Sequence, residues 1–324
     1  MMNEYYNNLV GSLPIFTDAE TPQPLKQKYG FVGMCEHIAR CAGICYNTTK
    51  EKRGEDAVQF VINLAKKGHG RALEFGTVVL KGDDTDVPFF EFFCNIPWAQ
   101  FDWLNDEDAQ YVVVTNLRYY LDNYGFGEDA EATLKHIRKC WESGNKDPLR
   151  FRYVDEERYN TFISWRPTIH YPLISRGVAD EFRTHTMLST LMRSTRYTGA
   201  NEGKGGNTHF ILPAGIKKNE RAMEVYKDGC MAALNTYKQL LELGEAKQIA
   251  RDVLPLGLGT EMVQCGFRLH WRNFVNLRTD SAAHPDAITT ARAVQYLLFG
   301  GRVTYKQQSN NMSNHKICSR YGEW

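Results

Sequence analysis

The spacing of apolar residues along this chain of 324 residues alternates between a helical period and short β-rich runs. A helical period predicts helices at about 33–45, 55–67, 128–143 and 286–299. A run of good helix formers predicts a further helical region over about 218–252. Runs rich in Val, Phe, Tyr and Thr predict short strands at 77–80, 89–93, 111–114, 162–165 and 210–213.

These helices and strands do not follow one another in a regular βαβ rhythm, which argues against a doubly wound parallel sheet. We therefore predict an α+β fold with a mixed or antiparallel sheet flanked by helices. The chain has no internal repeat and no low-complexity linker, so we expect a single domain over residues 1–324. The polar tail after residue 305 is expected to be disordered.

Composition and charge exclude several classes of partner. Hydrophobic residues make up 43% and charged residues 24% of the chain, as in ordinary globular proteins. The formal net charge of +1 argues against a nucleic-acid partner held by bulk electrostatics. No apolar run approaches the roughly 20 residues of a membrane-spanning helix, and the N-terminus lacks a signal-peptide pattern. We expect a cytoplasmic protein without a membrane or nucleic-acid partner.

The eight cysteines are scattered, without a CxxC pair, and are expected to be reduced and mostly buried. Cys35, His37, Cys41 and Cys45 raise the alternative of a metal site. Only Cys41 and Cys45 share a helical face, and no second ligand pair stands at a recognised spacing. We therefore predict no metal site.

The stretch 183–197 holds three arginines, a histidine and several hydroxyl groups, with no acidic residue among them. We predict that it is helical, which would place His185, Ser189, Arg193 and Arg196 on one face. Guanidinium, imidazole and hydroxyl donors together suit an anion such as a phosphate. An ordinary solvated basic face remains the alternative at this point.

Two further clusters, at 68–75 and 251–286, carry candidate site residues. The first places His69 and Glu74 just before a predicted strand, where loops often line sites. In the second, Asn273 and Arg278 stand among apolar and aromatic residues, so they need partners if they are buried. The glycine-rich stretch at 199–206 lacks the spacing and the Ser or Thr of a P-loop. No Rossmann fingerprint or nucleophile-elbow motif is present.

The order of these clusters resembles the flavin-dependent thymidylate synthases. Ala42–Tyr46 resembles the early Ala-Arg-Val-(Ser/Cys)-(Tyr/Phe) motif of that family, and His69 with Glu74 matches its His-x4-Glu. Residues 174–181 resemble the lead-in to the family signature, and 183–197 occupies the signature itself. That signature is usually written Arg-His-Arg-x2-Ser-x-(Asn/Ser)-(Glu/Gln)-x-Ser-x-Arg-Tyr. The resemblance implies the α+β fold of a thymidylate synthase-complementing protein.

The signature is degenerate, which marks a divergent member. The positions that agree with it are His185, Ser189, Ser194, Arg196 and Tyr197. Thr184 and Thr186 stand where the family has its two arginines, and Leu191 and Met192 replace its polar pair. Towards the C-terminus Arg251, Asn273 and Arg278 fit the family pattern, whereas His284 and Asp286 replace its glutamine and glutamate.

The chain is also longer than the family pattern, and we expect an insertion over about 75–173. Within it, Asn116 and Arg118 are candidates to replace lost flavin contacts. The alternative is an ordinary strand-to-helix joint with a solvated arginine.

The resemblance implies methylation of dUMP to dTMP, with FAD as cofactor and NADPH and methylenetetrahydrofolate as co-substrates, in a homotetramer. It assigns dUMP to Glu181, Ser194, Arg196, Arg251 and Arg278, with Ser194 and Arg278 catalytic and Arg278 polarising the uracil ring. It assigns FAD to His69, Glu74, Thr184, His185, Thr186 and Asn273. Two alternatives stay open: a nucleotide-binding relative that has lost its flavin, and a sibling enzyme that modifies another pyrimidine nucleotide, for example by hydroxymethylation.

Overall fold

Two strands rich in valine, β3 (Thr77–Gly82) and β5 (Tyr111–Asn116), form the centre of an N-terminal lobe that spans residues 30–165. Both strands are buried along their whole length because side chains cover both faces of the sheet. Alternate residues point to opposite faces: Val78 lies in one core and Val79 in another. The computed structural model describes residues 13–46, 48, 51–83, 98–104, 111–123, 129–196 and 207–301.

The sheet of the N-terminal lobe is antiparallel, with the strand order β4-β5-β3-β6. Its edges are β4 (Ala99–Trp103) and β6 (Arg152–Tyr153). Helices α2 (Gly30–Tyr46), α3 (Gly54–Lys66) and α7 (Ala130–Ser143) cover one face. These three confirm the helices predicted from the apolar period, and the strands predicted at 77–80 and 111–114 are also confirmed.

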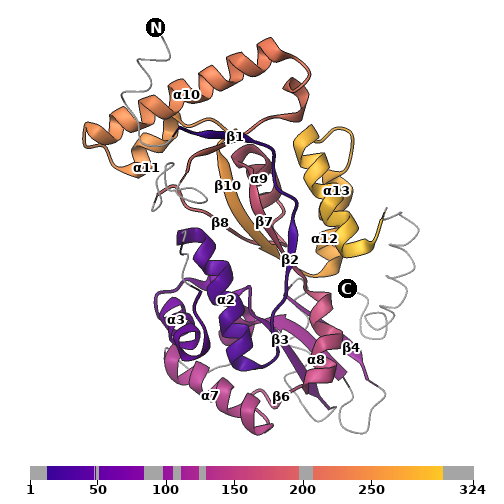
Figure 1. Cartoon of the computed structure of the whole chain (residues 1–324). Coiled ribbons are helices and arrows are strands. Elements are labelled where there is room, and N and C mark those ends of the chain that lie inside the picture. Colours follow the sequence, from indigo (N-terminus) through magenta and orange to yellow (C-terminus); the bar gives the residue numbers. More distant parts are fainter. Residues whose placement is uncertain are drawn as a thin grey trace, which may run out of the picture.

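A second four-stranded sheet forms the centre of the C-terminal lobe, which spans residues 13–25 and 166–301 (Figure 1). It is antiparallel, in the order β2-β7-β10-β8. Its strands are β2 (Gln23–Leu25), β7 (Thr168–Ser175), β10 (Gly259–Cys265) and β8 (Ser189–Met192). The predicted α+β class, with antiparallel sheets and flanking helices, is confirmed.

Helices α9 (Arg176–Arg183), α12 (Arg268–Arg278) and α13 (Pro285–Phe299) pack on one face of this sheet. The core between the helices and the sheet contains the aromatic pair Phe182 and Phe274, whose ring centroids lie 4.8 Å apart. The opposite face packs against α2 of the other lobe, so α2 belongs to the cores of both lobes. Helix α13 confirms the helix predicted at 286–299.

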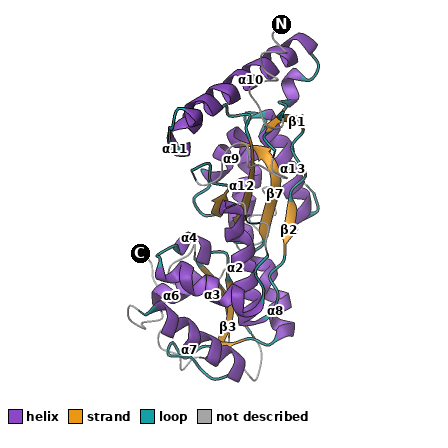
Figure 2. Cartoon of the chain, turned by 60° about the vertical axis from the view of Figure 1, so that its left-hand side comes forward, coloured by secondary structure: helices purple, strands orange, loops and turns teal. Residues whose placement is uncertain are grey.

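A third layer covers the far end of the C-terminal lobe, where the long helix α10 (Glu220–Glu242) lies across the molecule (Figure 2). It packs on β1 (Ile15–Thr17) and β9 (His209–Ile211), which form a two-stranded parallel sheet separate from the two antiparallel sheets. The helical region predicted at 218–252 is divided, because α10 ends before Gly244, whose φ is +92°. The remaining short helices are α4 (Gly70–Leu73), α6 (Leu117–Asn123), α8 (Glu156–Phe162), α11 (Lys247–Ala250), η1 (Ile163–Trp165), η4 (Ala214–Ile216) and η5 (Arg251–Val253).

Two predicted elements are wrong. Residues 162–165 are the end of α8 and a 3-10 turn, not a strand, because Asp155 caps α8 by accepting from the Arg158 amide and the helical run continues to Trp165. The described residues 184–196 of the stretch 183–197 are not a helix: α9 ends at Arg183, and 189–192 pairs with β10 as strand β8. The four residues predicted to share a helical face therefore do not share one. The predicted strand at 89–93, residues 197–206 and the tail after 305 lie outside the described residues.

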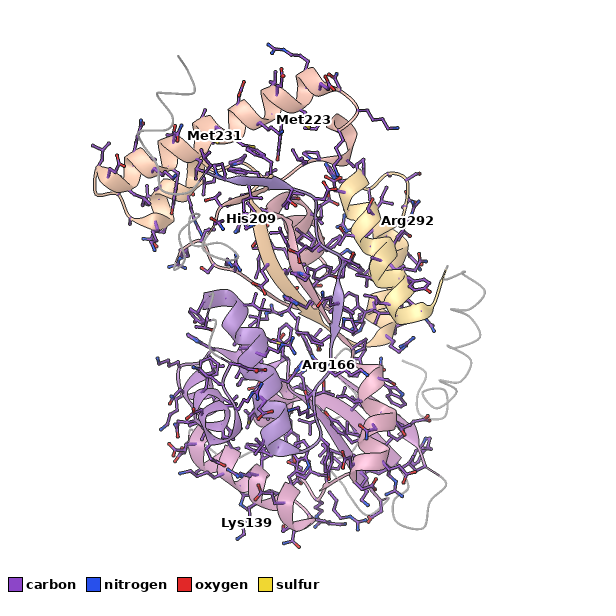
Figure 3. The ribbon with its side chains drawn as sticks, viewed as in Figure 1. Lys139, Arg166, His209, Met223, Met231 and Arg292 are labelled. Carbon is purple, nitrogen blue, oxygen red and sulfur yellow. The ribbon has the colours of Figure 1, made fainter. Side chains whose placement is uncertain are left out.

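Arg166, at the junction of the two lobes (Figure 3), is buried and donates to the main-chain oxygen of Glu74 and the hydroxyl of Thr77. We predict that Arg166→Met lowers the free energy of unfolding by about 3 kcal/mol, because both acceptors would be left buried without a donor. Urea denaturation measures this. The control is Arg221→Met on α10, whose side chain is 82% exposed and whose effect should stay within about 0.5 kcal/mol. Equal stability of the two variants would contradict the prediction.

Candidate functional site

The part of the signature that follows α9 is a tight turn that sends neighbouring side chains to different places. The His185 amide donates to the Phe182 carbonyl (3.2 Å), and the Leu188 amide donates to the His185 carbonyl (2.9 Å). As a result Thr184 and His185 contact Arg278, whereas Thr186 lines a cavity beside Glu74. Two clusters of predicted site residues thus lie on either side of one turn.

Arg278, the last residue of α12, holds the first cluster together. Its Nε donates to Nε2 of His185, and one terminal nitrogen donates to the Glu181 carboxylate, both at 2.9 Å. The other terminal nitrogen donates to the Glu181 main-chain oxygen and to the Thr184 hydroxyl, again at 2.9 Å. A guanidinium has five N–H donors, so these contacts leave one terminal N–H for a ligand. The Arg278 cluster therefore joins the signature to a motif more than ninety residues later.

His185 is neutral in this environment. Its burial, and next the charge of Arg278, lower its pKa to about 4. Arg278 can only donate, so Nε2 of His185 is the acceptor and the ring carries its proton on Nδ1. The ring packs edge-on against Phe274 at 4.9 Å between centroids. His185 thus orients Arg278 without adding positive charge.

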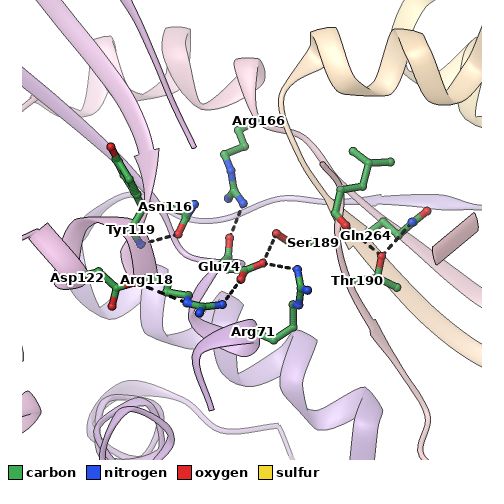
Figure 4. A network of polar contacts seen from close by, with 11 residues as sticks. Arg71, Glu74, Asn116, Arg118, Tyr119, Asp122, Arg166, Ser189, Thr190 and Gln264 are labelled. Carbon is green, nitrogen blue, oxygen red and sulfur yellow. Dashed lines mark hydrogen bonds and ion pairs between the residues drawn. The ribbon is translucent and has the colours of Figure 1, made fainter. Parts of the chain in front are cut away.

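Glu74 is the centre of the second cluster, and its side chain is 3% exposed (Figure 4). One carboxylate oxygen accepts from Arg118 at 2.6 Å, and the other accepts from Arg71 at 3.0 Å and from the hydroxyl of Ser189 at 2.7 Å. Its main-chain oxygen accepts from Arg166. A buried carboxylate is costly unless it is paired and hydrogen-bonded, and these contacts meet that requirement.

A cavity of about 280 Å³ opens beside Glu74, and we call it the Glu74 cavity. Its walls combine arginines, two aromatic rings and short polar side chains. They are Arg71, Glu74, Trp98, Asn116, Arg118, Tyr119, Asp122 and Thr186. Asn116 also caps α6 by accepting from the Tyr119 amide at 2.9 Å. Residues 116 and 117 do form a strand-to-helix joint, as the alternative had it, but Arg118 is not simply solvated, because its 46% exposed side chain pairs with buried Glu74.

The predicted phosphate residues lie at the end of β8, beside η5. The Ser194 amide donates to the Cys45 carbonyl of α2 (3.1 Å), and Arg251 donates to the Thr195 hydroxyl (3.3 Å). Burial lowers the pKa of the nearby Arg176 guanidinium, and the charge of Arg251 lowers it further against the opposing Asp180. Arg176 and Arg251 thus place two guanidinium groups close together, with Asp180 and Asp252 as the neighbouring carboxylates.

Two predicted residues stand apart from these clusters. His69, which precedes α4, and Asn273 on α12 are both exposed and line neither of the two cavities described here. Their assignment to FAD stays a prediction.

A larger cavity of about 620 Å³ lies between α2 and the C-terminal sheet. In its wall Glu261 pairs with His170 (2.8 Å). Glu261 also pairs with Arg193 (2.7 Å), which does not line the cavity. Although burial raises the pKa of Glu261, the hydrogen bonds and charges of these two partners hold it below its usual value. None of the predicted site residues lines this cavity. His170 and Glu261 lie within strands, where the sequence gives no sign of a site.

Arg71 was missed from the sequence although it belongs to the same cluster as Glu74. It stands three residues before Glu74, at the spacing that brings side chains together on a helix, which is a signal that was available.

Comparison with known proteins supports the same motifs. The family model described as thymidylate synthase complementing protein matches residues 106–298, more than half of the chain. The chain belongs to this family. The resemblance predicted from the motifs is thereby confirmed. The matched residues begin inside the predicted insertion and do not include Glu74. The insertion itself stays a prediction.

Curated proteins named flavin-dependent thymidylate synthase are similar to this chain at modest identity. The flavin-dependent thymidylate synthase of Thermosipho melanesiensis is 28% identical over 181 residues, which cover 48% of this chain and 75% of the relative. The enzyme of the same name from Pyrococcus abyssi is 28% identical over 104 residues, which cover 32% of this chain and 42% of the relative. Among the described residues, no helix is long and apolar enough to cross a membrane, and no three His, Cys, Asp or Glu side chains are grouped to hold a metal ion.

We predict that the His185 ring titrates near pH 4, well below the usual 6.5. As the pH falls from 6.5 towards 4, the His185 ring becomes protonated in the unfolded chain but stays neutral in the folded protein. The stability that neutral His185 contributes is thus complete above pH 6.5 and lost as the pH falls. NMR titration of the histidine ring protons measures the pKa, with His185→Gln identifying the signal.

Arg278→Met supplies the second measurement in the same titration. The pKa of His185 should rise when the guanidinium charge is removed but stay below 6.5, because burial is the larger cause. A midpoint at 6.5 in the unsubstituted protein would show that the ring is solvated instead.

Proposed function

We propose that this protein methylates dUMP to dTMP, with methylenetetrahydrofolate as the one-carbon donor and NADPH as the reductant. The observation that carries the proposal is the Arg278 cluster. There a C-terminal arginine is held by three residues of the signature and its lead-in, with one N–H left for a ligand. The names of the curated relatives support a flavin-dependent reaction.

In this proposal dUMP lies between Arg278 and Arg251. Arg196 and Arg251 bind its phosphate, for which a planar guanidinium is suited. Ser194 contacts the base, and Glu181 fixes the direction of Arg278. The free N–H of Arg278 polarises a uracil oxygen as negative charge develops there, which makes C5 nucleophilic.

The Glu74 cavity fits part of an FAD molecule. Its volume of about 280 Å³ lies just below the range of about 300–1,000 Å³ for ligand sites, so it suits one portion of the dinucleotide. Arginine donors and two aromatic rings fit a phosphate or a flat ring. Glu74 and Thr186 would hold FAD there. His69, Thr184, His185 and Asn273 do not line this cavity and would contact other parts of the dinucleotide. When bound, the flavin supplies the redox chemistry of the methyl transfer.

A homotetramer completes this proposal, since one copy of the chain offers only part of a dinucleotide site. In a single-domain protein with an insertion at 75–173, the insertion would contribute Asn116 and Arg118 to the same cavity.

One observation favours an alternative, a nucleotide-binding protein without flavin. Thr184 and Thr186 carry no charge where the signature has arginines, and Leu191 and Met192 are paired in strand β8 where it has polar residues. A sibling enzyme that hydroxymethylates another pyrimidine nucleotide is the other alternative.

The purified protein distinguishes these functions. The methylase should be yellow or take up added FAD, and should convert dUMP to dTMP with methylenetetrahydrofolate and NADPH, detected by mass spectrometry. Colourless protein that binds dUMP but takes up no FAD would overturn the proposal in favour of the flavin-free alternative. A product that carries a hydroxymethyl group would instead support the sibling enzyme.

Arg278→Ala should lower kcat by at least about a hundredfold, the typical effect of removing a donor that stabilises developing charge. FAD uptake, followed by absorbance, should be unchanged. The control is Arg292→Ala on α13, an exposed arginine labelled in Figure 3, which should keep full activity. Loss of FAD with Arg278→Ala would mean that this arginine belongs to the flavin site.

A further inference from the structure

Two arginines from different elements approach the carboxylate of Glu74 and line the same cavity. Arg71 belongs to α4 and Arg118 to α6, and each uses one terminal nitrogen to pair with Glu74. Their side chains are 54% and 46% exposed, so each guanidinium is held at one end and open to solvent at the other. Such a pair presents two fixed positive groups to whatever enters the cavity.

Both arginines keep donors for a ligand. Arg118 pairs with Glu74 at 2.6 Å and lies 3.7 Å from Asp122, which is a long contact to a largely exposed carboxylate. Within the described part of the chain, the second terminal nitrogen of each arginine has no hydrogen-bond partner. Guanidinium donors arranged in a planar fork match phosphate oxygens bidentately.

The absence of a side chain at Gly70 leaves room for Arg118 beside α4. A Cβ atom added at Gly70 would lie 2.9 Å from Nε of Arg118 and 3.1 Å from its Cζ. The guanidinium therefore lies across the glycine at the start of α4, in a space that any other residue would fill. The Arg118 guanidinium pairs with Glu74 at one end and lies against Gly70.

The signature residue Thr186 lines this same cavity, with a hydroxyl where the signature has an arginine. Thr184, where the other arginine is expected, is engaged by Arg278. Arg71 and Arg118 thus supply at this cavity the two guanidinium groups that the signature lacks, and Glu74 and Asp122 in the same wall carry the opposite charges.

We propose that Arg71 and Arg118 replace the two missing signature arginines and bind the diphosphate of the flavin dinucleotide in the Glu74 cavity. Arg71 and Arg118 lie on either side of the Glu74 carboxylate. Two separate guanidinium groups match a ligand that carries two adjacent phosphates better than a ligand that carries one carboxylate. The cavity is too small for the whole dinucleotide but large enough for this part of it. This inference rests on the proposed function, because it takes FAD as the ligand.

The first test measures the dissociation constant of FAD for purified full-length protein by flavin fluorescence. Arg118→Gln and Arg71→Gln should each raise it by about 10- to 100-fold, as expected for loss of a charge-assisted hydrogen bond. Riboflavin, which has the same ring but no phosphate, should bind all proteins equally. The control is Arg221→Gln on α10, which removes an equally charged but distant side chain and should leave FAD affinity unchanged.

The second test places an arginine at residue 186, where the signature has one. Thr186 is exposed, so Thr186→Arg can be accommodated, and it places a guanidinium at the wall of the cavity. In the Arg118→Gln background, Thr186→Arg should restore at least tenfold of the lost FAD affinity. Thermal unfolding without ligand should show that the variants fold. Restoration by a second site cannot arise from a general folding defect.

Several outcomes would overturn the inference. FAD affinity unchanged in both glutamine variants would refute it and leave the proposed function intact. Equal weakening of riboflavin would assign the arginines to the ring and not to the diphosphate. If the variants weakened methylenetetrahydrofolate and not FAD, the cavity would take the carboxylate tail of the folate. Unsubstituted protein that binds no FAD would refute both proposals together.

Discussion

The buried carboxylate of Glu74 is the interaction on which the arrangement of this molecule depends. Moving an ion of this kind out of water costs several kcal/mol unless donors surround it. Its donors come from α4, α6 and β8, and Arg166 at the lobe junction binds its main chain. Satisfying this one group therefore fixes the N-terminal lobe against the C-terminal sheet, and the same contacts shape the wall of the Glu74 cavity.

The turn after α9 divides the chemistry of the site between neighbouring residues. Thr184 and His185 orient Arg278, and Thr186 faces the other cavity. A short hydroxyl at 184 fits beside the Arg278 guanidinium, which already fills that space. The contacts of Arg278 and Glu74 are thus distributed over several elements and not carried by one motif.

The elements that depend on local pattern could be predicted from the sequence. Helices α2, α3, α7 and α13 follow from the apolar period, and the motif order identified Glu74, Glu181 and Arg278 as site candidates. The prediction failed at 183–197, where local propensity favours a helix but pairing with β10 makes a strand. It also gave no sign that His170 and Glu261 share a cavity wall, because strand residues 91 positions apart meet only in the folded sheet.

The order in which the partners of Glu74 occur along the chain bears on how the protein folds during synthesis. Arg71 is three residues before Glu74 and Arg118 is 44 residues after it, whereas Ser189 follows by 115. Domains generally fold as they emerge from the ribosome, N-terminal part first. The nascent N-terminal lobe can therefore neutralise its buried carboxylate with two arginines of its own, long before β8 has been translated. Ser189 completes the shell when the second sheet docks, so the growing chain never has to bury an uncompensated charge.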